Sequence, residues 1–350
     1  MITALKSQLY SRHIPALDGV RAASILLVIL YHFGFKQVNG SLGVEIFFVL
    51  SGFLITWLML TELDRKGDVS LKGFYMRRAF RLFPELYAYI AVGFAALVIR
   101  KSAEVPWGDI ISTFTYTSNY YQAFATRPDN YLSQTWSLAV EEQFYMLWPV
   151  LFISFQSKLK RLTWITAGII LAVWVHRWLL RFVFNADQGY IYLAFDTRAD
   201  HILIGCLAAL LIKQEVFPRF WAAICAHPAL PVLTAGLLGL SSMYHGRGFY
   251  RFGVGYCVEP ILAVFLIIQL VYFSRQWGWL TDNPVAAYLG KISYSLYLYQ
   301  GLVLYTARTM TQHLPLAVSL AFSLGVTVAF ASGSYHFIGR PALKLKERYK

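Results

Sequence analysis

The chain has 350 residues, of which 57% are hydrophobic and only 14% are charged, whereas an ordinary soluble domain carries about 25% charged residues. This composition excludes a soluble globular protein, because a soluble fold of this length has too little interior to hide so much apolar surface. The net charge of +13 does not indicate nucleic-acid binding, because the basic residues lie between apolar runs and do not gather on one face. Membrane lipid, and no nucleic acid, is the expected partner of these basic residues.

The apolar runs predict about ten membrane-spanning helices, each long enough to cross a hydrocarbon core of ~30 Å. In chain order they are expected near residues 17–35, 43–63, 85–99, 135–155, 162–180, 198–212, 220–244, 253–273, 284–305 and 314–337. The fold class is therefore all-α, in a polytopic integral membrane protein. No appended soluble domain, low-complexity tract or repeat is evident, so residues 1–350 are taken as one transmembrane domain.

The flanking charges predict how these helices are oriented. An even number of spans places both termini on one side, and Lys and Arg residues outside the spans divide 19 to 9 in favour of that side. Because cytoplasmic flanks carry the excess of Lys and Arg, both termini are expected in the cytoplasm and the protein in the cell inner membrane. Residues 64–84 then form a basic inner segment, and residues 100–134 form a polar, aromatic outer segment.

The first predicted helix carries two ionisable residues, Arg21 and His32. They are eleven residues apart, which is almost three full turns, so both side chains project from one face about 16 Å apart along the axis. Arg21 is expected near the cytoplasmic end, and His32 in the outer half, where a neutral imidazole can accept a proton near pH 7. The phase alone leaves a second interpretation equally open, in which Arg21 reaches to the inner surface and His32 bonds a neighbour.

Further charged residues interrupt or flank the apolar runs. Arg78 and Arg81 are three residues apart, so on a helix they form a neighbouring pair that suits phosphate oxygens or, alternatively, anchors the inner lipid surface. The adjacent Glu141 and Glu142 point about 100° apart on a helix and so need different partners, an Arg for one and a cavity for the other. Glu45 is expected either to pair with a buried cation or to lie at the outer mouth.

Asp200 and the cysteines are further candidates for special chemistry. Asp200 has two candidate partners beside it, since it could orient His201 or pair with Arg198, and a structural ion pair is the commoner outcome. The cysteines, Cys206, Cys225 and Cys257, share no CxxC-type spacing. The sequence therefore predicts neither a metal site nor a disulfide framework.

Several of these segments, in this order, resemble the acyltransferase 3 family of membrane O-acyltransferases. The resemblance covers nearly the whole chain and rests on Leu17-Asp18-Gly19, the Arg21-x10-His32 spacing, GVEIFFVLSGF, RRAFRLFPELY, WSLAVEEQFYMLWP, Arg198-Ala199-Asp200, LGKISYSLYL and FIGRP. Two positions depart from the family pattern: Tyr299-Gln300 stands where many relatives carry a His, and Gly339 where an acidic residue is common. The chain is also expected to lack the periplasmic hydrolase-like domain that many relatives carry.

The resemblance implies a reaction that composition and spacing cannot name. It implies transfer of an acyl group, most often acetyl, from cytoplasmic acyl-CoA to a hydroxyl of a carbohydrate or glycolipid acceptor at the outer side of the inner membrane. The implied catalytic residues are His32, Arg21 and Glu142. The implied binding residues for the donor, acetyl-CoA, are Arg78 and Arg81, and no metal is expected.

Two other classes of function are alternatives to acyl transfer. A secondary transporter that moves a small solute with proton coupling would also use intramembrane charges and Gly-rich breaks, but the halves of the chain show no paired hydropathy symmetry. A structural scaffold accounts for neither the in-phase Arg21 and His32 nor the Glu141–Glu142 pair. Release of free CoA from acetyl-CoA would separate an acyltransferase from a transporter.

Overall fold

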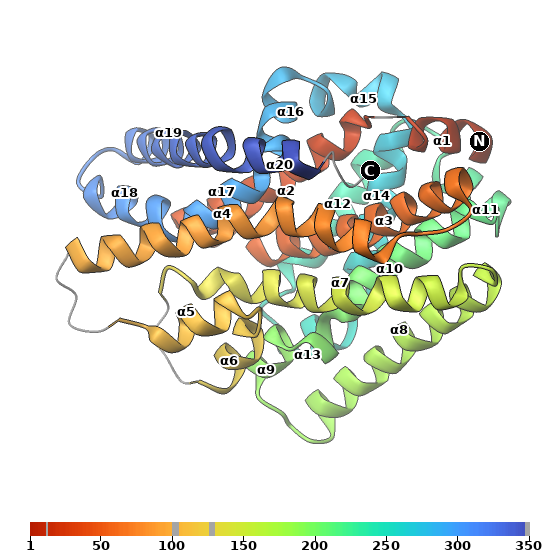
Figure 1. Ribbon diagram of the computed structural model, residues 1–350, viewed down its shortest axis with the longest axis horizontal. Helices are drawn as coiled ribbons and strands as arrows, with labels where there is room; N and C mark the ends of the chain where they lie inside the picture. Colours follow the sequence, from red (N-terminus) through yellow and green to blue (C-terminus); the bar gives the residue numbers. More distant parts are fainter. Residues whose placement is uncertain (12, 100–104, 126–129, 347–350) are drawn as a thin grey trace.

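The computed structural model describes residues 1–11, 13–99, 105–125 and 130–346, and every regular element within these ranges is a helix (Figure 1). The predicted all-α fold is thus confirmed. Residues 100–104 and 126–129 of the predicted outer segment lie outside the described ranges, as do Arg12 and residues 347–350.

Six helical stretches among the described residues are long and apolar enough to cross a membrane. They are α2 (Pro15–Phe33), α3 (Gly40–Lys66), α4 (Leu71–Ile99), α8 (Leu159–Phe182), the stretch Gly248–Tyr272 and the stretch Leu316–Leu345. A seventh is counted if the stretch Gln188–Lys213 and α11 (Pro218–Ile224), which meet at 116°, form one broken span. The total of about ten spans and the side on which the termini lie stay predictions.

The remaining elements complete or connect these stretches. Two of the long stretches contain π-helical turns: Gly248–Tyr272 comprises α13 (Gly248–Tyr250), η2 (Arg251–Gly255) and α14 (Tyr256–Tyr272), and the C-terminal stretch comprises α19 (Leu316–Ser334), η4 (Tyr335–Gly339) and α20 (Arg340–Lys346). The other elements are α1 (Ile2–Leu9), α5 (Trp107–Phe114), α6 (Ser118–Phe124), η1 (Ser133–Thr135), α7 (Trp136–Phe155), α9 (Gln188–Leu193), α10 (Phe195–Lys213), α12 (Leu230–Met243), α15 (Ser274–Thr281), α16 (Pro284–Lys291), α17 (Ser293–Tyr299), η3 (Gln300–Leu304) and α18 (Tyr305–Met310).

Helix α3 lies at the centre of the bundle, where it packs against α2, α10 and α14. Its contact with α10 is close because glycines face the opposite backbone. A Cβ atom at Gly52 would overlap the carbonyl of Ile202, and one at Gly205 would overlap the carbonyl of Val49. Small residues at such crossings are typical of helices that pack within a membrane.

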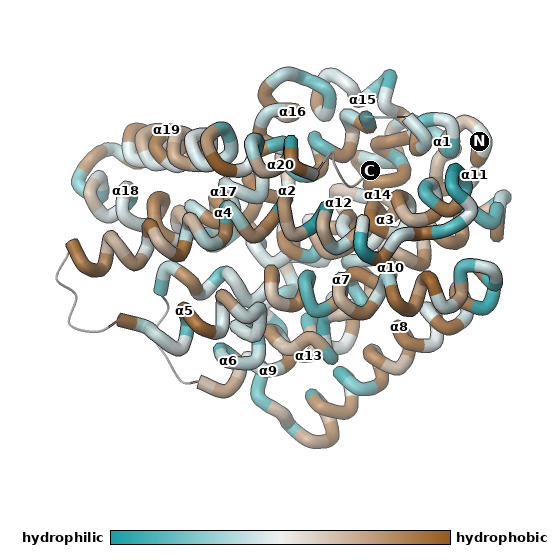
Figure 2. Tube along the Cα trace, in the orientation of Figure 1, coloured by the Kyte–Doolittle hydropathy of each residue, from teal (hydrophilic) through white to brown (hydrophobic). Residues whose placement is uncertain are grey.

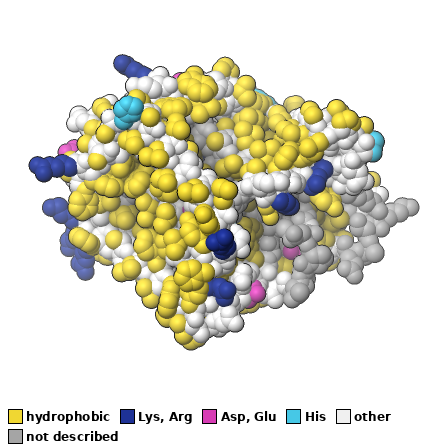
Figure 3. Space-filling view, turned by 180° about the vertical axis from the view of Figure 1, so that it is seen from behind, with side chains coloured by type: hydrophobic (Ala, Val, Ile, Leu, Met, Phe, Trp, Pro, Cys, Tyr) yellow, Lys and Arg dark blue, Asp and Glu magenta, His cyan; other side chains and the backbone are white. Residues whose placement is uncertain are grey.

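Hydrophobic residues cover most of the outside of the bundle. Figure 2 shows them along most of the length of the long helices, while hydrophilic residues gather at helix ends and connections. In Figure 3, which shows the molecule from behind, a broad hydrophobic surface covers one face and several Lys and Arg side chains line the edge at the left. This edge corresponds to the right-hand end of Figure 1, where α1 and the turn between α3 and α4 lie.

Three predicted elements differ from the structure. The basic segment expected as an inner connection over 64–84 is helical from Leu71 onward, as the first half of α4, and its charges lowered the apolar signal without breaking the helix. The span expected over 220–244 is divided between α11 and α12. The span expected over 284–305 begins as α16, where Asn283 caps the first turn ahead of Pro284, and continues as the separate elements α17, η3 and α18.

Candidate functional site

A cavity of about 950 Å³ lies between α2, α3, α4, α7 and α17. This volume is at the upper end of the ~300–1,000 Å³ range of small-molecule and cofactor sites. The lining follows α3 from Val44 to Lys66, which at 1.5 Å per residue corresponds to about 33 Å along the helix axis. The cavity therefore extends over roughly the thickness of a hydrocarbon core, ~30 Å.

The cavity has a basic end and an apolar middle. Its basic side chains outnumber its acidic ones, the acidic ones being Glu62 and Glu141; the basic ones are Arg21, Arg65, Lys66, Arg77, Arg78 and Arg81. Glu62 accepts a hydrogen bond from Arg77 at 2.8 Å. Asp18 and Glu142, outside the lining, pair with Arg21 and Arg78. Because the six basic side chains still outnumber these four carboxylates, this end carries an excess of positive charge that favours an anionic ligand.

Arg78 and Arg81 lie one turn apart on α4, as predicted, and both line the cavity. Arg78 stacks on the ring of Tyr145, with the guanidinium carbon 3.1 Å from the ring centroid. Its Nε and one terminal nitrogen both donate to Oε1 of Glu142 at 3.1 Å. Arg81, in contrast, forms no ion pair with an acidic side chain in the part of the chain that the structure describes.

The adjacent carboxylates of α7 have different surroundings, as the helical phase predicts. Glu142 accepts from Arg78, whereas Glu141 lines the cavity and accepts hydrogen bonds from the hydroxyls of Ser51 and Tyr145. Glu141 thus orients two hydroxyl groups in the cavity wall, and Glu142 orients the guanidinium group of Arg78. The prediction of an Arg partner for one carboxylate and a cavity for the other is confirmed.

Arg21 and His32 occupy opposite ends of α2, which is continuous between them. Arg21 lines the basic end of the cavity and pairs with Asp18 at 2.7 Å, and Asp18 in turn bonds His13 at 2.8 Å. His32 is exposed at the other end and is not among the described residues that line the cavity. The structure therefore brings Arg21, Arg78 and Arg81 into one cavity but leaves His32 beyond its wall.

The cavity nevertheless ends close to the turn of α2 that precedes His32. A Cβ atom at Gly43 would overlap the carbonyl of Ser24 and contact Val28, so Val44 at the end of the cavity lies beside this part of α2. The carbonyl of Val28 accepts a hydrogen bond from Nδ1 of His32 at 2.8 Å. Because a carbonyl cannot donate, Nδ1 carries the proton, and a neutral His32 ring then has its lone pair on Nε2, the arrangement of a proton acceptor.

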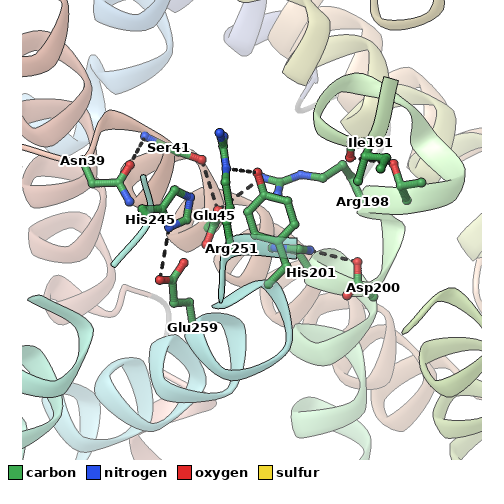
Figure 4. A network of polar contacts seen from close by, with 12 residues as sticks. Asn39, Ser41, Glu45, Ile191, Arg198, Asp200, His201, His245, Arg251 and Glu259 are labelled. Carbon is green, nitrogen blue, oxygen red and sulfur yellow. Dashed lines mark hydrogen bonds and ion pairs between the residues drawn. The ribbon is translucent and has the colours of Figure 1, made fainter. Parts of the chain in front are cut away.

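A second group of charged side chains lies buried between α3, α8 and α10 (Figure 4). Arg198 pairs with Glu45 at 3.4 Å, and Arg177 pairs with Asp200 at 2.9 Å, all four side chains being fully buried. Asp200 also contacts Nδ1 of His201 at 2.9 Å. The predicted cation partner of Glu45 is thus Arg198, while Asp200 pairs with Arg177 and not with Arg198.

Sequence reasoning gave no role to Arg177, His245 or Glu259, which join this group. Arg177 falls within the span predicted over 162–180, and the structure places it in the interior beside Asp200. Glu259 is fully buried and lies 3.4 Å from His245. Glu259 lies within an apolar run, so its position in a membrane helix is the signal that identifies it as a candidate.

The comparison with protein families matches residues 14–334 to the acyltransferase domain family. The chain is 32% identical to a Staphylococcus aureus protein provisionally named an O-acetyltransferase, over 95% of this chain and 58% of that protein. It is 30% identical to the peptidoglycan O-acetyltransferase OatA of Listeria monocytogenes, over 96% of this chain and 57% of that protein. The chain thus spans less than two thirds of the length of these relatives. No solved structure matches it at a significant level.

Proposed function

This chain belongs to the acyltransferase domain family that covers residues 14–334, and from that premise we propose that it is a membrane O-acyltransferase. It transfers an acetyl group from cytoplasmic acetyl-CoA to a hydroxyl of a carbohydrate or glycoconjugate at the outer side of the inner membrane. The observation that carries this proposal is the long cavity with a basic end. Its dimensions and charge suit a ligand that is anionic at one end and narrow along the rest.

The donor enters at the basic end in this proposal. The CoA phosphates contact Arg78 and Arg81, because guanidinium groups bind phosphate oxygens through paired hydrogen bonds. Glu142 keeps Arg78 oriented through its two hydrogen bonds and so acts as a positioning residue. The pantetheine arm follows α3 past Leu54 and Phe48 toward Val44.

The acceptor hydroxyl meets the thioester near the outer end of α2. Nε2 of His32 removes the hydroxyl proton while the oxygen attacks the thioester carbonyl. The C–S bond then breaks, the CoA thiolate leaves and an ester forms on the acceptor. Arg21, at the opposite end of the same helix, adds to the positive charge at the donor end. Since His32 lies beyond the cavity wall, this role needs the acyl group to pass Val44 and reach the last turn of α2.

The acceptor class is proposed from the relatives and from the outer segment. Two of the relatives carry the name of peptidoglycan O-acetyltransferases, one of them provisionally. The helices α5 and α6 form a shallow hollow of about 580 Å³ with Tyr120, Tyr121 and Phe124 in its lining. Aromatic rings of this kind supply flat apolar faces on which sugar rings can pack.

The test uses protein reconstituted in liposomes with acetyl-CoA and a muramyl oligosaccharide as acceptor. The proposal predicts release of free CoA that depends on the acceptor, together with an oligosaccharide product heavier by one acetyl group. CoA release without an acetylated product would exclude the carbohydrate acceptor. Absence of CoA release with any hydroxyl acceptor, from protein that still binds CoA, would contradict acyl transfer itself.

A further inference from the structure

Three potential metal ligands converge in the buried group, from segments far apart in sequence. They are Glu45 of α3, His245 in the turn between α12 and α13, and Glu259 of α14, and Figure 4 shows them facing one another. Each offers a ligand atom within 4.8 Å of the others. Glu45 and Glu259 are fully buried, and the His245 side chain is 10% exposed.

The hydrogen bonds leave several of the possible ligand atoms of these residues without partners. One oxygen of each carboxylate is held in place: Ser41 donates to Oε1 of Glu45 at 3.1 Å, and Ser241 donates to Oε1 of Glu259 at 2.5 Å. The second oxygen of each, Oε2, has no hydrogen-bond partner in the described part of the chain, and neither has either ring nitrogen of His245. Buried polar atoms of this kind are rare unless a water molecule or an ion meets them.

The separation between His245 and Glu259 fits two ligands of one ion better than it fits a direct hydrogen bond. Nδ1 of His245 lies 3.4 Å from Oε1 of Glu259 without forming a hydrogen bond. Bonds of about 2.0–2.1 Å to a tetrahedral ion place neighbouring ligand atoms about 3.3 Å apart. Ser41 and Ser241 then act as the outer donors that usually orient metal-binding carboxylates.

The two carboxylates share one close Arg, which pairs with Glu45 and not with Glu259. Arg198 is 3.4 Å from Glu45, longer than the ~2.7–2.9 Å of a good charge-assisted hydrogen bond. Its guanidinium carbon lies 4.1 Å from the ring centroid of Tyr256, and Arg251 donates to the hydroxyl of the same Tyr256. Glu259 has no Lys or Arg partner within the described residues.

We propose that Glu45, His245 and Glu259 bind a divalent first-row transition-metal ion. Two carboxylates and one imidazole suit Zn²⁺, Mn²⁺ and Fe²⁺, and the carboxylates neutralise the charge of such an ion. The ion ties α3 to α14 and to the turn that precedes α13, so its role is structural. The two residues directly after His245, in the same turn, are exposed.

The experiment measures bound metal directly. Full-length protein is isolated in detergent through a tag without histidine, stripped with a chelator, incubated with Zn²⁺ or with Mn²⁺, and desalted. Elemental mass spectrometry should find about one equivalent of one of these ions per chain. His245→Gln and Glu259→Gln should each lower this content at least tenfold, whereas His313→Gln and Glu215→Gln, at exposed positions, should leave it unchanged.

A spectroscopic measurement on the unaltered protein covers the case in which a ligand variant does not fold. Co²⁺ should bind with visible absorption bands of a mixed oxygen and nitrogen site, and Zn²⁺ should abolish them. Two results would overturn the proposal. One is folded wild-type protein that retains neither Zn²⁺ nor Mn²⁺ and gives no Co²⁺ bands; the other is an equal metal content in wild type, His245→Gln and Glu259→Gln.

Discussion

The basic cavity and the buried charged group differ in how their charges are balanced. In the buried group, Arg177 pairs with Asp200 and Arg198 with Glu45, and none of these side chains is exposed. In the cavity, six basic side chains face two lining carboxylates. Asp18 and Glu142, outside the lining, pair with Arg21 and Arg78, but Arg81 has no acidic partner within the described residues.

This difference shows that charged residues inside a membrane protein can serve two purposes, to hold helices together or to bind a ligand. A buried charge is costly unless paired, so matched pairs that fill the interior hold helices together. An excess of one sign along a cavity instead favours a ligand of the opposite sign. Substitutions in the buried group should therefore lower stability, and substitutions along the path from the cavity to His32 should lower activity.

The largest expected effect is on activity, at the C-terminal end of α2. His32→Ala should lower the rate of acyl transfer by about 10²–10⁴-fold, the usual contribution of a general base. The protein should still insert and keep its thermal midpoint, because the side chain is exposed at a helix end. Transfer is measured as acceptor-dependent CoA release. The matched control is His313→Ala, also exposed, and full activity in His32→Ala would exclude the proposed role.

The largest effect on stability is expected in the buried group. Asp200→Asn leaves Arg177 without its carboxylate in a fully buried position, which should cost about 3–5 kcal/mol of unfolding free energy. Thermal denaturation in detergent compares this variant with Asp282→Asn, at an exposed position. A thermal midpoint as high as that of the control would show that this ion pair does not hold the helices together.

A smaller effect on donor use is expected where Glu142 orients Arg78. Glu142→Ala removes an acceptor of two hydrogen bonds from Arg78, and the loss of about 1.5 kcal/mol corresponds to roughly a tenfold change. The apparent KM for acetyl-CoA should rise by about this factor, while kcat changes less. An unchanged KM would mean that Arg78 keeps its position without Glu142, or that it does not contact the donor.

The smallest effect is expected on stability, when the buried group loses one neutral hydrogen-bond donor. The indole nitrogen of Trp174 donates to Oδ2 of Asp200 at 2.9 Å, and Asp200 keeps Arg177 and His201 when this donor is lost. Trp174→Phe should therefore cost only about 1 kcal/mol. A decrease in the thermal midpoint as large as that of Asp200→Asn would show that the indole, and not the ion pair, dominates the group.

Much of the fold could be predicted from hydropathy. The predicted ends of the spans that became α2, α7, α8 and α10 agree with the structure to within about three residues. The first half of α4 was missed because Arg77, Arg78 and Arg81 lower its hydropathy, although one helix holds them all. The span predicted over 284–305 is divided into several elements. An apolar run therefore does not predict that the helix is continuous.

The candidate site was predictable only where helical phase links residues. Helical periodicity correctly predicted that Glu141 and Glu142 have different surroundings. It also predicted that Arg78 and Arg81 lie side by side. It could not show that Glu45 meets Arg198, because 153 residues separate them and either side chain suits many partners. The same limit hid Glu259 and His245, which have no metal-ligand spacing in sequence and meet Glu45 only through packing of α3 against α14.

The most direct measurement is calorimetric binding of CoA, without acceptor, to wild-type protein and to the double variant Arg78→Gln, Arg81→Gln. The account predicts an affinity at least ~100-fold weaker in the variant and a smaller dependence on salt, because two phosphate-binding cations are lost. Pantetheine, which lacks the phosphates, should bind both proteins alike, and Arg161→Gln, at an exposed position outside the cavity lining, should bind CoA as wild type does. Equal CoA affinity in wild type and the double variant would contradict the assignment of the basic cavity to the donor.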